Sequence, residues 1–190
     1  MTEIYLIRHG ETAWSRSGRH TSVTDLDLTE IGVRQAESLK GRLDPAAFDL
    51  VLSSPRLRAR RTAELAGFSA DRVELCEDLV EWDYGDYEGV TSADIRAERP
   101  GWTIWTGDVP GGETAEQVRA RLTRVIDRAA GSGLDRVLCF GHGHGLRAMT
   151  LCWLGLDFGL GDSFPLATGT VSVLAPYKGG RALSRWNSQL

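Results

Sequence analysis

The sequence has few cysteines, no excess of positive charge and no long apolar run. Cys76, Cys139 and Cys152 are odd in number and widely spaced, and no Cys-x-x-Cys pair occurs. This pattern is not that of a disulfide framework. Cys139 and Cys152 lie in apolar segments and are expected to be core thiols, in a reducing compartment, the cytoplasm. The formal net charge of -4 excludes the global basic surface that nucleic-acid binding requires.

No apolar run approaches the roughly 20 residues of a membrane-spanning helix, and the N-terminus shows no signal-peptide pattern. The sequence also shows no internal repeat, low-complexity tract or linker. With 190 residues, of which 42% are hydrophobic, the chain is long enough to bury a sizeable core. We therefore expect one domain over residues 1–190, with no membrane partner.

The first motif lies at the start of the chain. Ile4–Ile7 is a continuous apolar run, typical of a strand buried on both faces, and Arg8, His9 and Gly10 follow it directly. Ligands of open α/β sheets bind beyond the carboxyl ends of the strands, so an active site is expected here. A histidine there can be a nucleophile, a base or a metal ligand. The alternative is a polar strand end with a surface histidine.

Strands and helices are predicted to alternate along the chain. The expected strands after the first are 48–52, 72–75, 136–140, 170–174 and 182–186, and the expected helices are 29–43, 54–67, 92–98, 113–130 and 146–153. Thr29 and Ser54 are expected N-caps, with Pro55 at the first helical position. Arg58 then lies in a first helical turn, where it could clamp a phosphate or be an exposed helix arginine. Three strand–loop–helix units predict a three-layer α/β/α sandwich with a mostly parallel central sheet.

Histidines are scarce, and two of them follow buried strands. The four histidines are His9, His20, His142 and His144. His9 and His142 are both expected to face one crevice at the edge of the sheet. Gly141–Gly145 resembles a dinucleotide-binding loop, although Gly-x-Gly-x-x-Gly requires a glycine where Leu146 stands. His142 and His144 could instead belong to a metal site that another histidine or a loop acid completes.

A third interpretation is phosphoryl transfer. His9 could attack phosphorus, while Arg8, Arg58 and His142 supply the positive charge that the phosphoryl oxygens require. The residues alone leave this alternative open beside the dinucleotide and metal sites.

The segment Leu79–Gly89 is dense in acidic and aromatic residues. A carboxyl group held among apolar rings can act as a general acid. The candidates by chemistry are Glu81, Asp83, Asp86 and Glu88, and composition does not choose between them. Trp102 and Trp105 lie in a later loop, where they could cover a ligand or simply pack.

The motifs together resemble the histidine phosphatase superfamily, also called phosphoglycerate-mutase-like. Leu6–Thr12 (Leu-Ile-Arg-His-Gly-Glu-Thr) is similar to its signature. Further segments match in the same order: Leu28–Gly32, Ser53–Ala59, Glu81–Gly89, Gly111–Thr114 and Gly141–Gly143. The likeness spans most of the chain, and it implies a phosphoglycerate-mutase-like version of the predicted sandwich.

This resemblance implies a role for five residues. His9 would be the nucleophile that becomes phosphohistidine, and Arg8 and Arg58 would clamp the phosphoryl group, which His142 also contacts. Glu81 matches the proton donor, which protonates the leaving oxygen and later activates water. The resemblance implies no metal or other cofactor, because the arginines and the second histidine neutralise the charge.

Further positions match substrate contacts of the family. Ser15, Thr21 and Gly143 fall at such positions. Ser22 borders the expected phosphate pocket but stands where the family usually has glycine, which leaves substrate choice open. His144 lies beside these residues, and it could contact substrate or be a loop histidine.

Two departures favour a phosphatase over a mutase. Phosphoglycerate mutases carry Glu-Arg-His-Tyr-Gly where this chain has Glu81–Gly85, and they contain an insertion after it. The chain looks like a branch of sugar-phosphate phosphatases that includes sedoheptulose-1,7-bisphosphatase and small bacterial acid phosphatases. We expect hydrolysis of a small phosphorylated metabolite, a sugar phosphate. The alternatives are a mutase-type phosphotransferase, a non-catalytic phosphate-binding module and a metal-dependent hydrolase. The aromatic strand near Trp186 could pair with a second copy, giving a homodimer, or pack inward.

Overall fold

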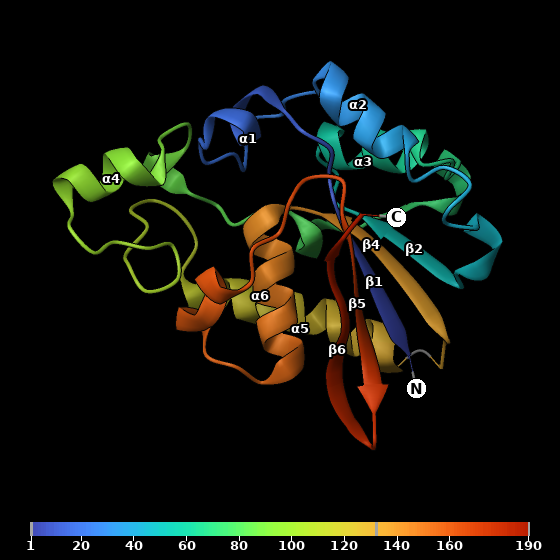
Figure 1. The fold of residues 1–190 in the computed structure, drawn as a ribbon. Helices are drawn as coiled ribbons and strands as arrows, with labels where there is room; N and C mark the ends of the chain where they lie inside the picture. Colours follow the sequence, from blue (N-terminus) through green and yellow to red (C-terminus); the bar gives the residue numbers. More distant parts are fainter. Residues whose placement is uncertain (1, 132, 190) are drawn as a thin grey trace.

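The computed structural model describes residues 2–131 and 133–189 (Figure 1). The strands are β1 (Glu3–Arg8), β2 (Leu50–Ser53), β3 (Glu74–Leu75), β4 (Arg136–Gly141), β5 (Val171–Tyr177) and β6 (Gly180–Ser188). The α-helices are α1 (Ala13–Ser17), α2 (Glu30–Glu37), α3 (Leu57–Leu65), α4 (Ser92–Glu98), α5 (Ala115–Gly131) and α6 (Gly143–Leu154). The short 3-10 helices are η1 (Pro45–Ala47), η2 (Ala70–Arg72), η3 (Glu77–Leu79), η4 (Gly85–Tyr87) and η5 (Phe158–Ser163).

The strands form one mostly parallel sheet in the order β3-β2-β4-β1-β5-β6. β3, β2, β4 and β1 pair in parallel, while β5 and β6 are antiparallel. In the central pair, Arg8 of β1 lies opposite Gly141 of β4. The residues that follow, His9 and His142, therefore leave the sheet side by side.

Helices cover both faces of the sheet (Figure 1). Because side chains alternate along a strand, Leu6 and Cys139 pack under α5 and α6, while Ile7 and Phe140 pack under α2 and α3. The result is the predicted α/β/α sandwich, with two hydrophobic cores on either side of a buried sheet.

Local signals of the sequence place α2 against the end of β1. Thr29 is the N-cap that was predicted, and its hydroxyl accepts a hydrogen bond from Gly32 N at 3.1 Å. A Cβ on Gly10 would lie 2.3 Å from Gly32 O. Only glycine fits at Gly10, so the backbone beside His9 packs directly on the first turn of α2.

The start of α3 differs from the prediction. The helix begins at Leu57, two residues after Pro55, and Arg56 is its N-cap without a side-chain hydrogen bond. The orphan amide of Leu57 donates instead to Asp25 Oδ1, at 2.7 Å. Ser54 is not the N-cap: its Oγ accepts from Arg56 N at 3.3 Å and lies 2.7 Å from His142 Nε2. A distant acid thus satisfies the first amide of α3.

The sequence left two roles open for Trp102 and Trp105, covering a ligand or packing, and the structure places both in the packed interior. Trp102 and Trp105 are buried, and their indole N–H groups donate to Asp108 O at 3.0 Å and Asp162 Oδ1 at 2.9 Å. Trp186 on the edge strand β6 also packs inward, where its Nε1 donates to Pro165 O at 2.7 Å. Across residues 2–131 and 133–189, no helix has both the length and the apolar character that a membrane span needs.

Candidate active site

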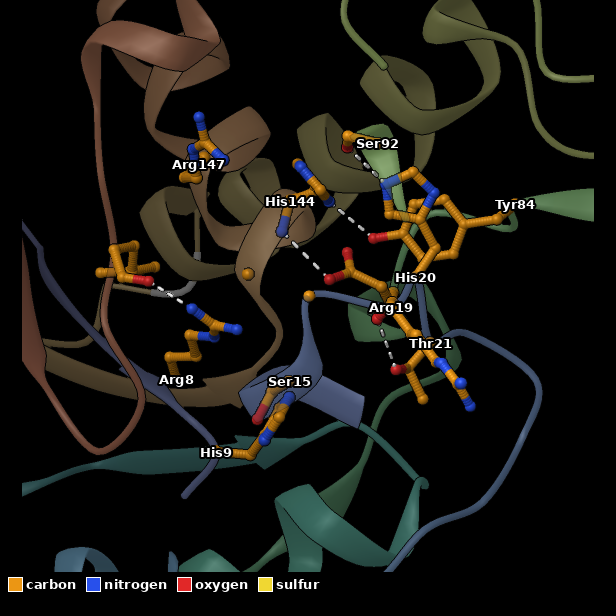
Figure 2. A pocket seen from close by; sticks show the side chains of 14 residues that line it. Arg8, His9, Ser15, Arg19, His20, Thr21, Tyr84, Ser92, His144 and Arg147 are labelled. Carbon is orange, nitrogen blue, oxygen red and sulfur yellow. Dashed lines mark hydrogen bonds between the residues drawn. The ribbon is translucent and has the colours of Figure 1, made fainter. Parts of the chain in front are cut away.

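A cavity of about 180 Å³ opens beyond the end of β1 and beside the first turn of α6 (Figure 2). Its lining includes three arginines, three histidines and one carboxylate. The lining residues are Arg8, His9, Ser15, Gly18, Arg19, His20, Thr21, Glu81, Tyr84, Ser92, Gly143, His144, Arg147 and Leu166. This composition favours an anionic ligand.

His9 is held with one ring nitrogen bonded and the other free. Its Nδ1 lies 2.7 Å from Gly10 O, and a carbonyl oxygen can only accept, so Nδ1 carries the proton. Its backbone N donates to Gly141 O at 3.0 Å, which fixes the ring relative to β4. The lone pair of the neutral ring is therefore on Nε2, which is the nucleophilic atom of an imidazole in this tautomer.

The surroundings keep His9 uncharged. Burial lowers the pKa of His9 well below its usual value, and the charges of Arg58 and Arg8 lower it further. A neutral imidazole has the lone pair that nucleophilic attack requires. The arginines thus both attract an anion and keep the histidine beside it unprotonated.

Arg8 is the cation that lines the cavity next to His9. Its NH1 donates to Leu166 O, and its buried Nε has no hydrogen-bond partner. The first residue of α6, Gly143, lies against the guanidinium, since a Cβ there would be 3.2 Å from Arg8 Cζ. The unpartnered N–H is a donor that an anionic ligand could satisfy.

Arg58 and His142 lie behind the cavity wall, which differs from the expected direct clamp. Both are almost completely buried, and neither lines the cavity. Arg58 Nε donates to His142 Nδ1 at 3.1 Å, so His142 carries its proton on Nε2 and donates it to Ser54 Oγ. The His142 ring packs edge-on against that of His9, with centroids 5.3 Å apart.

The rest of the Arg58 guanidinium holds the loop 21–24. Its NH2 donates to Thr21 O at 3.1 Å and Ser22 O at 3.3 Å, and its NH1 donates to Thr24 O at 3.1 Å. Ser22 was predicted to bind substrate, but it is buried and does not line the cavity. Its Oγ donates to Glu88 Oε2 at 2.7 Å, so the hydroxyl already has a protein partner.

The structure separates the four acids that composition left equivalent. Only Glu81 lines the cavity. Its Oε1 accepts from Trp82 N at 2.9 Å and Gly145 N at 2.7 Å, and its Oε2 accepts from His144 N at 3.0 Å. Glu88 clamps the loop 21–24. Because Glu81 already occupies the first amides of α6, these amides are not free for the pyrophosphate of a dinucleotide.

Sequence reasoning gave no role to several lining residues. Those it missed are Gly18, Arg19, Ser92, Arg147 and Leu166, while His20 entered only as a candidate metal ligand and Tyr84 only as part of a loop expected to shape specificity. His20 stacks on Tyr84 with ring centroids 4.5 Å apart, and burial lowers its pKa to about 4. The Tyr84 hydroxyl lies 2.6 Å from His144 Nδ1. The scarcity of histidine and the density of aromatic residues around Tyr84 were the available signals.

The lining also includes Ser15, Thr21 and Gly143, predicted from the family's substrate positions, and His144, for which the sequence left a substrate contact or a loop position open. In the described part of the chain, no three His, Cys, Asp or Glu side chains are grouped as metal ligands would be. Figure 2 shows Arg8 and Arg147 at one side of the cavity, His20 with Tyr84 at the other, and His144 between them with its ring joined to the Tyr84 hydroxyl.

A buried histidine beside an arginine-lined cavity, at the carboxyl edge of a mostly parallel sheet, is the arrangement of an α/β protein whose cavity suits an anionic ligand. The chain belongs to the histidine phosphatase superfamily, branch 1, whose family model matches residues 4–189. The predicted family and fold are thereby confirmed.

Similar proteins support a phosphatase. An acid phosphatase of Mycobacterium tuberculosis is 39% identical over 184 residues, covering 95% of this chain and 90% of that protein. A sedoheptulose 1,7-bisphosphatase of Saccharomyces cerevisiae is 37% identical, covering 80% and 67%. A solved structure of an open reading frame from Mycobacterium tuberculosis has a TM-score of 0.91 at 38% identity, over 98% of this chain and 97% of that one.

Proposed function

We propose that this protein is a metal-independent phosphatase that hydrolyses a small phosphorylated metabolite through a phosphohistidine on His9. The observation that carries the proposal is the state of His9: a neutral ring whose Nδ1 proton is held by Gly10 O, at a cavity lined by Arg8. Arg8 and Arg58 would supply the positive charge for the phosphoryl oxygens, so the chemistry needs no metal ion.

In the first step, His9 Nε2 attacks phosphorus in line with the ester oxygen. The N–P bond forms as the P–O bond breaks, and the Glu81 carboxyl gives its proton to the leaving oxygen. The phosphorylated ring is cationic, and its Nδ1–H still donates to Gly10 O. That hydrogen bond strengthens as the ring becomes charged, which favours the intermediate.

In the second step, a water molecule attacks the phosphohistidine. The Glu81 carboxylate takes a proton from this water as its oxygen bonds to phosphorus. The P–N bond breaks, inorganic phosphate leaves, and His9 regains its neutral form. Glu81 thus ends the cycle in the protonated form in which it began.

For the substrate we propose a sugar phosphate. The cavity wall carries hydroxyl and imidazole groups, which suit a hydroxylated carbon chain, and one relative is named for a sugar bisphosphate. We assign substrate contacts to Ser15, Thr21, Gly143 and His144. Cys76, Cys139 and Cys152 are free thiols, and a reducing cytoplasm would keep them so.

A mutase-type phosphotransferase is the second candidate. A 2,3-bisphosphoglycerate-dependent phosphoglycerate mutase of a Methylobacterium is 34% identical over 187 residues, covering 90% of this chain and 89% of that protein. The same His9 and Glu81 would serve that reaction, with a second hydroxyl in place of water. The third candidate is a phosphate-binding module that does not turn over a substrate.

The test is phosphate release from sugar bisphosphates, sugar monophosphates, phosphoglycerates and p-nitrophenyl phosphate, with chelator present and His9→Ala alongside. We expect release that resists the chelator and is lost in His9→Ala. We also expect base-stable, acid-labile phosphoprotein after rapid quenching. Phosphate moving between positions of one substrate would indicate the mutase. Equal release by wild type and His9→Ala would reject the proposal.

A further inference from the structure

The backbone that precedes Glu81 is held by an arginine outside the cavity. Arg121 of α5 is only 6% exposed and does not line the cavity. Its NH1 donates to Asp78 O at 2.9 Å and to Val80 O at 2.8 Å. The carbonyl of Val80 belongs to the peptide bond that leads directly into Glu81, so the guanidinium fixes this bond from behind.

Glu113 fixes the backbone that follows Glu81 in the chain. Its carboxylate accepts from Arg121 Nε at 2.7 Å and NH2 at 2.9 Å, in a two-point ion pair. The same carboxylate accepts from Asp83 N at 2.9 Å. Its backbone also bonds the segment, because Glu113 N donates to Asp83 O at 3.0 Å and Trp82 Nε1 donates to Glu113 O at 2.9 Å.

The Glu81 carboxylate itself is anchored elsewhere, on the first amides of α6. Those amides belong to α6, a different helix from α5, which carries Arg121. A glutamate can keep such contacts with its oxygens aimed at the substrate only if its own backbone stays in place. Proton transfer needs an oxygen–oxygen approach of about 2.6–3.2 Å, and a displacement of about 1 Å can reduce a rate about 10²-fold.

We propose that Arg121, through its ion pair with Glu113, is a positioning residue that aims Glu81 at the leaving-group oxygen. This role rests on the proposed function of Glu81 as proton donor. Neither side chain touches the substrate. Their contribution is to hold the peptide bonds on both sides of Glu81, while α6 holds its carboxylate.

Leaving groups separate this role from a general loss of structure. An alkoxide is a poor leaving group, so a sugar phosphate depends on the proton from Glu81. A nitrophenolate leaves without protonation, so p-nitrophenyl phosphate depends on it little. A misplaced Glu81 therefore slows the sugar ester selectively, whereas partial unfolding or a damaged phosphate site slows both esters equally.

The experiment compares Arg121→Lys with Arg124→Lys on both esters. Arg124 lies on the same helix and bonds the carboxylate of Asp78, at 3.0 Å from Nε, but it is 62% exposed and bonds no backbone of this segment. Lysine keeps the charge of Arg121 but cannot reach Glu113 at two points and two carbonyls at once. For Arg121→Lys we expect kcat/KM to fall more than about tenfold for the sugar ester and less than about threefold for the aryl ester. Complete loss of general acid catalysis, about 10²–10⁴-fold, sets the upper limit for the sugar ester.

As the control, Arg124→Lys should have the kcat/KM of the wild type on both esters. Equal losses on both esters, or no loss on either, would overturn the positioning role while leaving the phosphatase intact. A wild-type protein inactive on both esters would reject the proposed function and this role with it. If Arg121→Lys does not fold, as judged by its thermal transition, Glu113→Gln keeps the shape of the side chain and should give the same selective loss.

Discussion

Arg58 and His142 form a buried hydrogen bond that sets the tautomer of His142, the histidine packed against His9. Arg58 Nε lies 3.1 Å from His142 Nδ1, and a guanidinium can only donate. His142 therefore carries its proton on Nε2, whereas His9 carries its own on Nδ1. The two rings, 5.3 Å apart, are held in opposite tautomers by partners outside the cavity.

Arg58→Lys should lose this control. An ammonium cannot bond His142 and the three loop carbonyls at the same time, since it lacks the planar fork of a guanidinium. We expect kcat/KM to fall about 10²-fold or more, with a change in the imidazole ¹⁵N shifts of His142. Arg60→Lys, on the exposed side of α3, is the control. Unaltered shifts with full activity would contradict the tautomer assignment.

Gly143→Ala should weaken substrate binding without weakening the fold. A Cβ at this position would lie 3.2 Å from Arg8 Cζ and 3.3 Å from its Nε, so the methyl group displaces the guanidinium from the cavity wall. Alanine also favours a helix over glycine by about 1 kcal/mol. We expect KM to rise about tenfold with an unchanged or higher melting temperature.

The matched control is Gly131→Ala at the end of α5, where a Cβ meets nothing within 4 Å. This variant should leave KM as in wild type. A Gly143→Ala protein with wild-type KM would show that Arg8 does not depend on the glycine for its position.

Glu88→Gln should loosen the loop that Arg58 holds. Burial acts to raise the pKa of Glu88, but hydrogen bonds from Ser22 and Thr24 outweigh it, and the pKa lies below its usual value. The amide oxygen of glutamine can replace Oε1, which accepts from Ser22 N and Thr24 N, but its NH2 group cannot accept from Ser22 N and Oγ as Oε2 does. We expect a loss of about 1–3 kcal/mol in the free energy of unfolding, measured with urea at neutral pH.

Glu98→Gln on the exposed face of α4 is the control for charge removal and should change the urea midpoint little. In wild type, the contribution of Glu88 is present at neutral pH and is lost as pH falls through its lowered pKa. If Glu88→Gln is as stable as wild type, Arg58 alone holds the loop.

Stability should fall as pH decreases below about 6.5, the usual pKa of histidine. Burial lowers the pKa of all four histidines, to about 4 for His20 and well below the usual value for the others. As pH falls, the unfolded chain binds protons before the folded chain does, so folding loses free energy. Each histidine contributes a slope of about 1.4 kcal/mol per pH unit.

Urea unfolding between pH 5 and 7 measures this slope, in a window above the range where carboxylates titrate. His20→Gln should reduce the slope of stability against pH by about 1.4 kcal/mol per pH unit, which corresponds to one proton. This reduction does not depend on how the substitution changes stability at pH 7. A flat profile over the window would show that the histidines are not buried as neutral groups.

Local signals were enough to predict the order of the strands and of every described α-helix except α1, and the residues at the end of β1. Apolar runs, the Thr29 cap and the strand–histidine junctions are short-range patterns, and short-range physics produces them. The Leu6–Thr12 motif and the segments that match with it were enough for the family. The start of α3 was missed because its cap, Asp25, lies 32 residues before Leu57.

Packing between distant segments decided which groups face the cavity. Arg58 turns inward because its acceptors come from the loop 21–24 and from His142, 84 residues away. Glu81 is separated from Glu88 because one meets the amides of α6 and the other those of Ser22 and Thr24. The sequence alone determined which residue types were available and on which elements they lie. Only the tertiary structure could decide their directions, since a buried polar group points to whatever partner the fold brings within hydrogen-bond distance.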